Sequence, residues 1–231
     1  LEAQIDRDHR IPDELLDLIR EMGLFAYAIP AEHGGLGLSK WAEVRTIFEF
    51  CRAAPAYRSY VGTTNGVGGK SIVIDGTDEQ KRRYLPDIAA GKLIVSFCLT
   101  EPGSGSDAKS LSTSARRDGD SYVLNGSKRF ISNAPIAGLF TVMARTDPDD
   151  KSAAGVSAFL VEAGTAGIHI DPPLEKMGQL AAPTADVTFT DCRIPGDALL
   201  GATEGTGFIT AMKVLDDARI HMGAVSVGLA T

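Results

Sequence analysis

The sequence has few of the residues that build disulfide frameworks or metal centres. Its 231 residues include three cysteines and four histidines. These are Cys51, Cys98 and Cys192, and His9, His33, His169 and His221. The cysteines are odd in number and far apart, and the histidines show neither an HExxH spacing nor a convergent Cys/Asp set. We therefore expect neither a disulfide framework nor a metal site.

Positive charge and long apolar runs are lacking too. With 23 Lys and Arg against 30 Asp and Glu, the net charge is -7, which argues against a nucleic-acid surface. No apolar run approaches the roughly 20 residues of a membrane span, and residues 1–10 are too charged for a signal peptide. Because the cysteine usage also suggests a reducing compartment, we expect a soluble cytoplasmic protein.

Helical signals fill the first 91 residues of an otherwise ordinary globular composition. Apolar spacing predicts a helix over 12–23. Ser39 is the expected N-cap of a second helix, whose core-facing stripe begins at Trp41. Thr77 and Gln80 form a capping box that opens a further helix. The sequence therefore predicts a helical N-terminal domain over 1–91.

Strand signals follow, because short β-branched and aromatic runs alternate with turn dipeptides. Strands are expected within 93–99, 122–124, 140–144, 156–161 and 187–189, with tight turns at Asp118-Gly119 and Asn125-Gly126. This pattern predicts an antiparallel β-barrel-like domain over 92–200. The fold class is thus α+β.

A helical period returns at Gly207 and still runs at Thr231. Residues 201–231 are therefore predicted to form the first helix of a C-terminal helical domain. Because this helix is amphipathic and no partner helix follows it, we expect its apolar face to need a covering element.

The densest local motif is the stretch 98–107, Cys-Leu-Thr-Glu-Pro-Gly-Ser-Gly-Ser-Asp, which leaves a predicted buried strand. Small residues of this kind expose backbone N–H groups and hydroxyls that suit a phosphate or pyrophosphate. A plain Gly/Ser turn has the same composition, so loop chemistry alone leaves both interpretations open.

Read with Phe97, this stretch resembles the first signature of the acyl-CoA dehydrogenase flavoprotein family. Residues 125–133 resemble the family's Asn-Gly, Lys, aromatic-Ile-Thr/Ser-Asn segment, and further motifs recur in the expected order as far as Gly207-Phe208. The resemblance covers essentially the whole chain. It implies an enzyme of fatty acid metabolism that binds FAD, desaturates an acyl-CoA between its α and β carbons, and passes electrons to an electron-transfer flavoprotein. It also implies a homotetramer.

The resemblance further implies which residues contact the ligands. One side of the flavin would be lined by Phe97, Leu99 and Thr100, and the other by Phe130 and Ser132. The hydroxyls of Thr100 and Ser132 would bond the polar edge of the ring. Ser106 would touch the cofactor pyrophosphate and the pantetheine, and Asp216 and Arg219 the CoA. Ordinary roles for these residues, in a core, a strand, a turn or a solvated helix face, stay open.

No catalytic residue is assigned. Abstraction of the α-proton, with hydride transfer to flavin N5, needs a positioned carboxylate. Most of the family place this Glu in the C-terminal helical domain. A minority place it in the last helix of this chain, one residue before the Arg, where this sequence has Ala218. Glu101 belongs to the signature loop and is not expected to accept the proton.

The chain is therefore predicted to be an inactive fragment of a dehydrogenase that lacks the catalytic Glu. Two alternatives remain. One is a related flavin-dependent acyl-CoA oxidase or monooxygenase on the same scaffold. The other is a non-catalytic CoA- or flavin-binding module.

Overall fold

A computed structural model describes residues 2–52 and 55–231 of the chain. The α-helices are α1 (Glu2–Asp8), α2 (Asp13–Glu21), α3 (Lys40–Phe50), α4 (Pro55–Thr63), α5 (Gly69–Asp75), α6 (Asp78–Ala89) and α7 (Gly207–Leu229), and a π-helical turn, η2 (Thr64–Gly68), joins α4 to α5. The strands are β1 (Val95–Cys98), β2 (Ser114–Asp118), β3 (Ser121–Ser132), β4 (Leu139–Arg145), β5 (Val156–Glu162), β6 (Ile168–Ile170) and β7 (Thr184–Pro195). Across the described ranges, no helix is both long and apolar enough to cross a membrane.

The predicted helix starts are confirmed. The Ser39 side chain accepts a hydrogen bond from the backbone N–H of Ala42, and Thr77 and Gln80 form the reciprocal capping box at α6. The predicted core-facing position of Trp41 is wrong, because its side chain is 71% exposed. Helix α3 buries Glu43 instead, since the face that packs against α7 meets charged partners there.

The strands form one mixed sheet in the order β1-β4-β2-β3-β7-β6, with β5 paired to β4. The α+β class is confirmed, but the expectation of a wholly antiparallel sheet is wrong. Strand β1 runs parallel to β4, and β2 joins β4 through a parallel pairing. The β2–β3 hairpin lies between β1 and β4 in the chain. Because this hairpin separates them, β4 can lie beside β1 and run in the same direction. A tight turn between the two strands would have made them antiparallel.

Of the two predicted turns, one is confirmed. Gly119, with φ +62°, connects β2 and β3. The Asn125-Gly126 turn is wrong, because β3 continues through it and its register with β7 shifts there. Asn125 exchanges two hydrogen bonds with Asp191 of β7, of 2.8 and 3.1 Å. The Asn-Gly pair thus marks a β-bulge, which uses the same backbone freedom as a turn.

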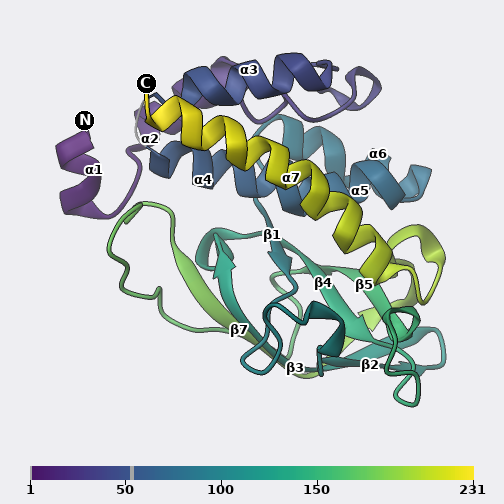
Figure 1. The fold of residues 1–231 in the computed structure, drawn as a ribbon. Helices are drawn as coiled ribbons and strands as arrows, with labels where there is room; N and C mark the ends of the chain where they lie inside the picture. The colour runs from purple at the N-terminus through teal and green to yellow at the C-terminus, as the bar shows by residue number, and fades with distance from the viewer. Residues whose placement is uncertain (1, 53–54) are drawn as a thin grey trace.

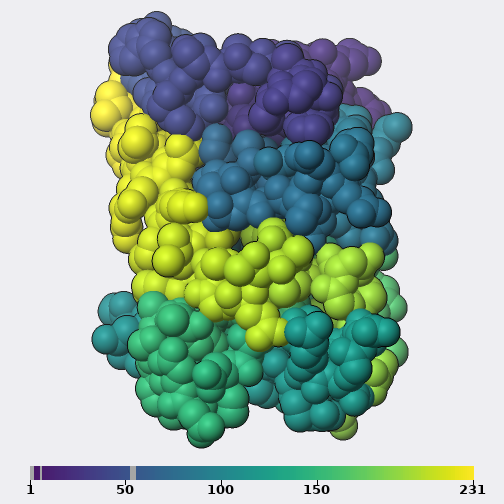
Figure 2. All heavy atoms as spheres, turned by 90° about the vertical axis from the view of Figure 1, so that its right-hand side faces the viewer, coloured from purple at the N-terminus to yellow at the C-terminus, as the bar shows by residue number. Residues whose placement is uncertain are grey.

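The helices lie on one side of the sheet (Figure 1). Helix α7, yellow in Figures 1 and 2, runs over the surface from the sheet up to the N-terminal helices. One apolar cluster joins Ile72 and Leu85 of the helical layer, Met143 and Leu160 of the sheet, and Ala211 of α7. The start of the predicted apolar stripe of α7 is covered, because Ala211 and Val214 are buried and Phe208, Met212 and Leu215 pack against this cluster. The need of α7 for a further covering element stays a prediction. The large exposed side chains of α7 are Ile209, Ile220, Met222, Val227 and Leu229. The domain limits after residues 91 and 200 stay a prediction.

Candidate functional site

A cleft of about 410 Å³ opens where the ends of β1 and β3, the loop after β1 and the first half of α7 meet. Its volume lies in the range of small-molecule sites, roughly 300–1,000 Å³. Its lining is Phe97, Leu99, Thr100, Gly105, Ser106, Asp107, Ala108, Lys109, Phe130, Ile131, Phe208, Met212, Leu215 and Arg219. The walls are thus mainly apolar and aromatic, with a few hydroxyl and charged groups.

Most of the predicted ligand-contacting residues meet in this cleft. Its lining includes Phe97, Leu99, Thr100, Ser106, Phe130 and Arg219. Ser132 and Asp216 are exposed and lie outside the lining. Ser132 is the last residue of β3, and its carbonyl accepts a hydrogen bond of 2.8 Å from Ser96 Oγ. Asp216 pairs with Arg219 along α7. The ligand roles of all these residues stay predictions.

A buried ion pair fastens two walls of the cleft together. Lys128 of β3 donates to Glu101 Oε1 at 2.7 Å and to the Leu99 carbonyl at 3.4 Å. Its side chain is 0% exposed and that of Glu101 is 2% exposed. Next to this pair, the Arg129 N–H donates to the Thr100 carbonyl at 2.8 Å. Residues 128–129 therefore hold the end of β3 against residues 99–101.

The Glu101 carboxylate also closes the base of the signature loop. It accepts hydrogen bonds from the N–H and Oγ of Ser112 at 2.6 and 2.8 Å, and from the N–H of Thr113 at 2.9 Å. Burial alone would raise the pKa of Glu101, but Lys128 and these hydrogen bonds lower it to about 2. An effective general base has a pKa near the working pH. Glu101 is thus suited to fastening the loop and unsuited to accepting a proton.

The polar groups of the lining suit an anionic ligand that carries a flat ring. Two cations, Lys109 and Arg219, line the cleft together with one carboxylate, Asp107. Asp107 is exposed and accepts a hydrogen bond from Ser110 Oγ. A Cβ added at Gly105 would meet nothing within 4 Å, so the loop leaves open space. Phosphates would find cations and hydroxyls here, and an aromatic ring would find Phe97 and Phe130. The residues present therefore fit a flavin dinucleotide.

Comparison with known proteins identifies the family. Residues 1–92 match the acyl-CoA dehydrogenase N-terminal domain, and residues 96–192 match the acyl-CoA dehydrogenase middle domain. The chain belongs to the acyl-CoA dehydrogenase family. The predicted resemblance is thereby confirmed.

Two curated relatives span almost the whole chain. A probable acyl-CoA dehydrogenase, fadE25, of Mycobacterium leprae is 40% identical over 228 residues, which are 99% of this chain and 58% of that protein. A 3-(aryl)acrylate reductase of Clostridium sporogenes is 37% identical over 227 residues, or 98% and 60%. The chain thus spans about three fifths of the length of these relatives.

A solved acyl-CoA dehydrogenase structure shares the fold. The Bacillus anthracis enzyme complexed with FAD superimposes with a TM-score of 0.87 at 37% identity, over 98% of this chain and 38% of that one. The arrangement of helices and sheet described above is therefore that of the acyl-CoA dehydrogenase family.

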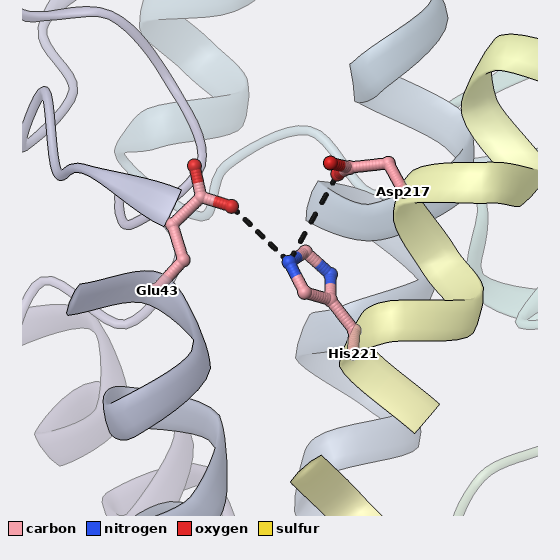
Figure 3. Close-up of side chains that lie close together, drawn as sticks. All are labelled: Glu43, Asp217 and His221. Carbon is pink, nitrogen blue, oxygen red and sulfur yellow. Dashed lines mark hydrogen bonds and ion pairs between the residues drawn. The ribbon is translucent and has the colours of Figure 1, made fainter. Parts of the chain in front are cut away.

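This family member also contains a buried charged cluster that the sequence analysis missed. His221 of α7 is fully buried, and its Nε2 lies 3.1 Å from Glu43 Oε2 of α3 and 3.9 Å from Asp217 Oδ2 (Figure 3). Lys40 pairs with both carboxylates, and Lys70 lies 3.8 Å from each. The expectation that no set converges on a histidine is wrong, because residues 178 positions apart meet here. Asp217 and His221 have the i,i+4 spacing of neighbours on one helix, but no local spacing signals that Glu43 meets them.

Two ammonium groups thus face the two carboxylates of this cluster. Burial alone would raise the pKa of Glu43, but hydrogen bonds from His221 and Lys40 and the charge of Lys70 lower it. The cluster joins α3, α5 and α7, and Asp217 lies two residues before Arg219 of the cleft. Its evident role is to hold α7 in place.

We expect divalent cations not to stabilise the protein through Glu43, Asp217 and His221, although their ligand atoms lie within 4.8 Å of one another. A cation would have to displace Lys40 and would be repelled by Lys70. The melting temperature should therefore be unchanged by excess Zn²⁺ or Ni²⁺. A metal-dependent rise that His221→Gln abolishes would contradict this expectation.

Proposed function

We propose that the chain forms the FAD- and acyl-CoA-binding part of an enzyme that oxidises an acyl-CoA thioester between its α and β carbons. The observation that carries the proposal is the cleft itself. It brings Phe97, Thr100 and Ser106 of the first signature segment together with Phe130 of the second, beside Arg219 of α7.

Each wall has a distinct task in this proposal. Phe97, Leu99 and Thr100 pack against one side of the isoalloxazine, and Phe130 against the other. The Thr100 hydroxyl bonds the polar edge of the ring, as protein groups near flavin nitrogens do when they tune its electronics. When bound, FAD supplies the acceptor for the hydride that leaves the β carbon.

The signature loop and α7 bind the phosphorylated parts of the ligands. Ser106 offers a hydroxyl to the cofactor pyrophosphate and to the pantetheine. Arg219, whose planar guanidinium suits phosphate, takes the CoA. Its pairing with the exposed Asp216 is solvated, so a phosphate can replace the carboxylate at little cost.

The proton-abstracting base comes from outside the 231 residues in this proposal. Among the described residues that line the cleft, the one carboxylate is the exposed Asp107, and position 218 is Ala. The relatives are longer than this chain by about two fifths of their length. Loss of a general base typically lowers the rate ~10²–10⁴-fold, so these residues alone are expected to be inactive.

The electron partner sets the direction in which such an enzyme runs. We propose an electron-transfer flavoprotein as the acceptor and a homotetramer as the assembly. The Clostridium relative is named a reductase, and the same cleft would serve the reverse reaction with a reduced donor. An oxidase is distinguished by rapid reaction of its reduced flavin with oxygen.

Anaerobic mixing of the full-length protein with a panel of acyl-CoAs tests the proposal. We expect purified protein to carry FAD and its visible absorption to bleach with at least one acyl-CoA. The 231-residue chain alone should bind FAD weakly and should not bleach. Full-length protein that takes up no flavin, or robust bleaching by the short chain, would contradict the proposal.

A further inference from the structure

The end of β3 contains an extra residue beside the cleft. Lys128 pairs with Val187 of β7, and Ile131 pairs with Ala185, so that the register shifts between the two pairs. Arg129 and Phe130 therefore stand opposite a single β7 residue, Asp186. Two residues against one is the definition of a β-bulge, which commonly re-aims a side chain next to a functional site.

Phe130 adopts a conformation that a bulky residue rarely takes. Its φ is +60°, in the left-handed region that favours glycine. Its side chain is 57% exposed beside the cleft, whereas that of the next residue, Ile131, is 2% exposed. A strained backbone persists only where its surroundings hold it, and such residues gather at functional sites.

The Asp186 carboxylate is the group that holds this conformation. Its Oδ1 accepts a hydrogen bond of 2.9 Å from the Phe130 N–H. Its Oδ2 lies 3.8 Å from Arg129 Nε. The Arg129 guanidinium in turn lies 4.9 Å from the centre of the Phe130 ring. One carboxylate therefore satisfies the backbone of the aromatic residue and restrains the cation stacked on its ring.

We propose that Asp186 is a positioning residue that holds the Phe130 ring as the second wall of the flavin slot. This inference rests on the proposed function and deepens it. Asp186 is absent from the cleft lining, so it acts through Phe130 rather than by touching a ligand. Without its acceptor oxygen, the Phe130 N–H loses its partner, the left-handed backbone relaxes, and the ring leaves the cleft.

Two substitutions of Asp186 in the full-length protein distinguish its role as hydrogen-bond acceptor for the Phe130 N–H from the role of its negative charge. Asp186→Asn retains the Oδ1 acceptor and removes the attraction for Arg129, so it should bind FAD nearly as the wild type does. Asp186→Ala removes the acceptor and should weaken FAD binding about 10-fold, which is 1.4 kcal/mol. It should also change the visible circular dichroism of the flavin that remains bound. If the Ala variant does not fold, Asp186→Ser takes its place, because the serine side chain is too short for its hydroxyl to reach the Phe130 N–H.

Asp191→Ala is the matched control. Asp191 lies on the same strand at the other bulge, where it bonds Asn125, and it is not a cleft residue. The Asp191→Ala substitution should loosen the β3–β7 pairing at that bulge without altering flavin affinity or the flavin spectrum. Equal loss of flavin signals in the Asp191 and Asp186 variants would show a merely structural effect and overturn the inference.

Hydrogen exchange of the Phe130 amide provides a readout without ligand. Exchange should accelerate at least 10-fold in Asp186→Ala and stay close to the wild-type rate in Asp186→Asn. Unchanged exchange in Asp186→Ala would overturn the inference even if FAD binds. Accelerated exchange in a protein that takes up no flavin would instead refute the proposed function and the ligand role of the Phe130 ring, while leaving Asp186 as the anchor of the bulge.

Discussion

Replacing Lys128 with Met is expected to lower the free energy of unfolding by about 3–5 kcal/mol, the usual cost of breaking a buried ion pair from one side. The substitution leaves the Glu101 carboxylate, whose side chain is 2% exposed, without its cation. It also removes the contact from Lys128 to the Leu99 carbonyl. Urea unfolding followed by far-UV circular dichroism measures the change.

Arg83→Met is the matched control for this experiment. The Arg83–Glu162 pair has the same 2.7 Å separation, but its side chains are 55% and 54% exposed. Exposed pairs contribute only about 0–1 kcal/mol. If the Lys128 and Arg83 variants lost similar stability, the buried Lys128–Glu101 pair would contribute no more to folding than an exposed pair, which would contradict the prediction.

The same pair makes stability depend on pH in a defined direction. The pKa of Glu101 is about 2 in the folded protein, below the ordinary value of about 4.3. A depressed folded-state pKa adds stability above the ordinary pKa, and this contribution is lost as the pH falls toward 2. Glu101→Gln lacks the ionising group. The difference in stability between wild type and this variant should therefore narrow between pH 5 and pH 2.

Gly207→Ala is expected to destabilise the protein by roughly 1–3 kcal/mol, as overpacking does. A Cβ at Gly207 would lie 2.3–2.7 Å from backbone atoms of Ser157 and Ala158 on β5. These atoms belong to a paired strand, so α7 would have to move instead. Because Phe208 and Met212 of α7 line the cleft, flavin binding should weaken together with stability. Thermal unfolding and an FAD titration measure the two effects.

Gly223→Ala, in the same helix, should change the stability in the opposite direction. A Cβ at Gly223 would meet nothing within 4 Å, and Ala is favoured over Gly in a helix interior by about 0.5–1 kcal/mol. We expect this variant to be as stable as the wild type or more so. Equal behaviour of the two substitutions would show that close approach to β5 does not limit the position of α7.

The contacts along α7 show how the cleft acquires its third wall. Near its start, Thr210 and Lys213 bond the carboxylate of Asp75 at 2.7 and 2.8 Å. One turn further on, Asp217 and His221 join the buried cluster with α3. Arg219 lies between these last two attachments. Its position relative to the sheet is therefore set by groups that come from the helical layer.

Local chemistry in the sequence determined much of the fold and the family. The caps at Ser39 and Thr77 were predictable because a side chain there bonds N–H groups only three residues away. Five of the seven strands in the described residues were predictable from their composition, whereas β2 and β6 were not predicted. The signature stretch 98–107 marked the cleft. Resemblance to the family then indicated the cleft residues around Thr100 and Phe130.

Only the tertiary structure decided the features that depend on partners distant in the chain. The same Asn-Gly dipeptide suits a turn or a bulge, and pairing with Asp191 of β7 made it a bulge. Glu43, rather than Trp41, faces inward because Lys40, Lys70, Asp217 and His221 surround it. Lys128 can be buried only because the carboxylate of Glu101, 27 residues earlier, accepts a hydrogen bond from its ammonium group. The energy of a charge or a strained backbone depends on what lies beside it in space, and a linear pattern does not contain that information.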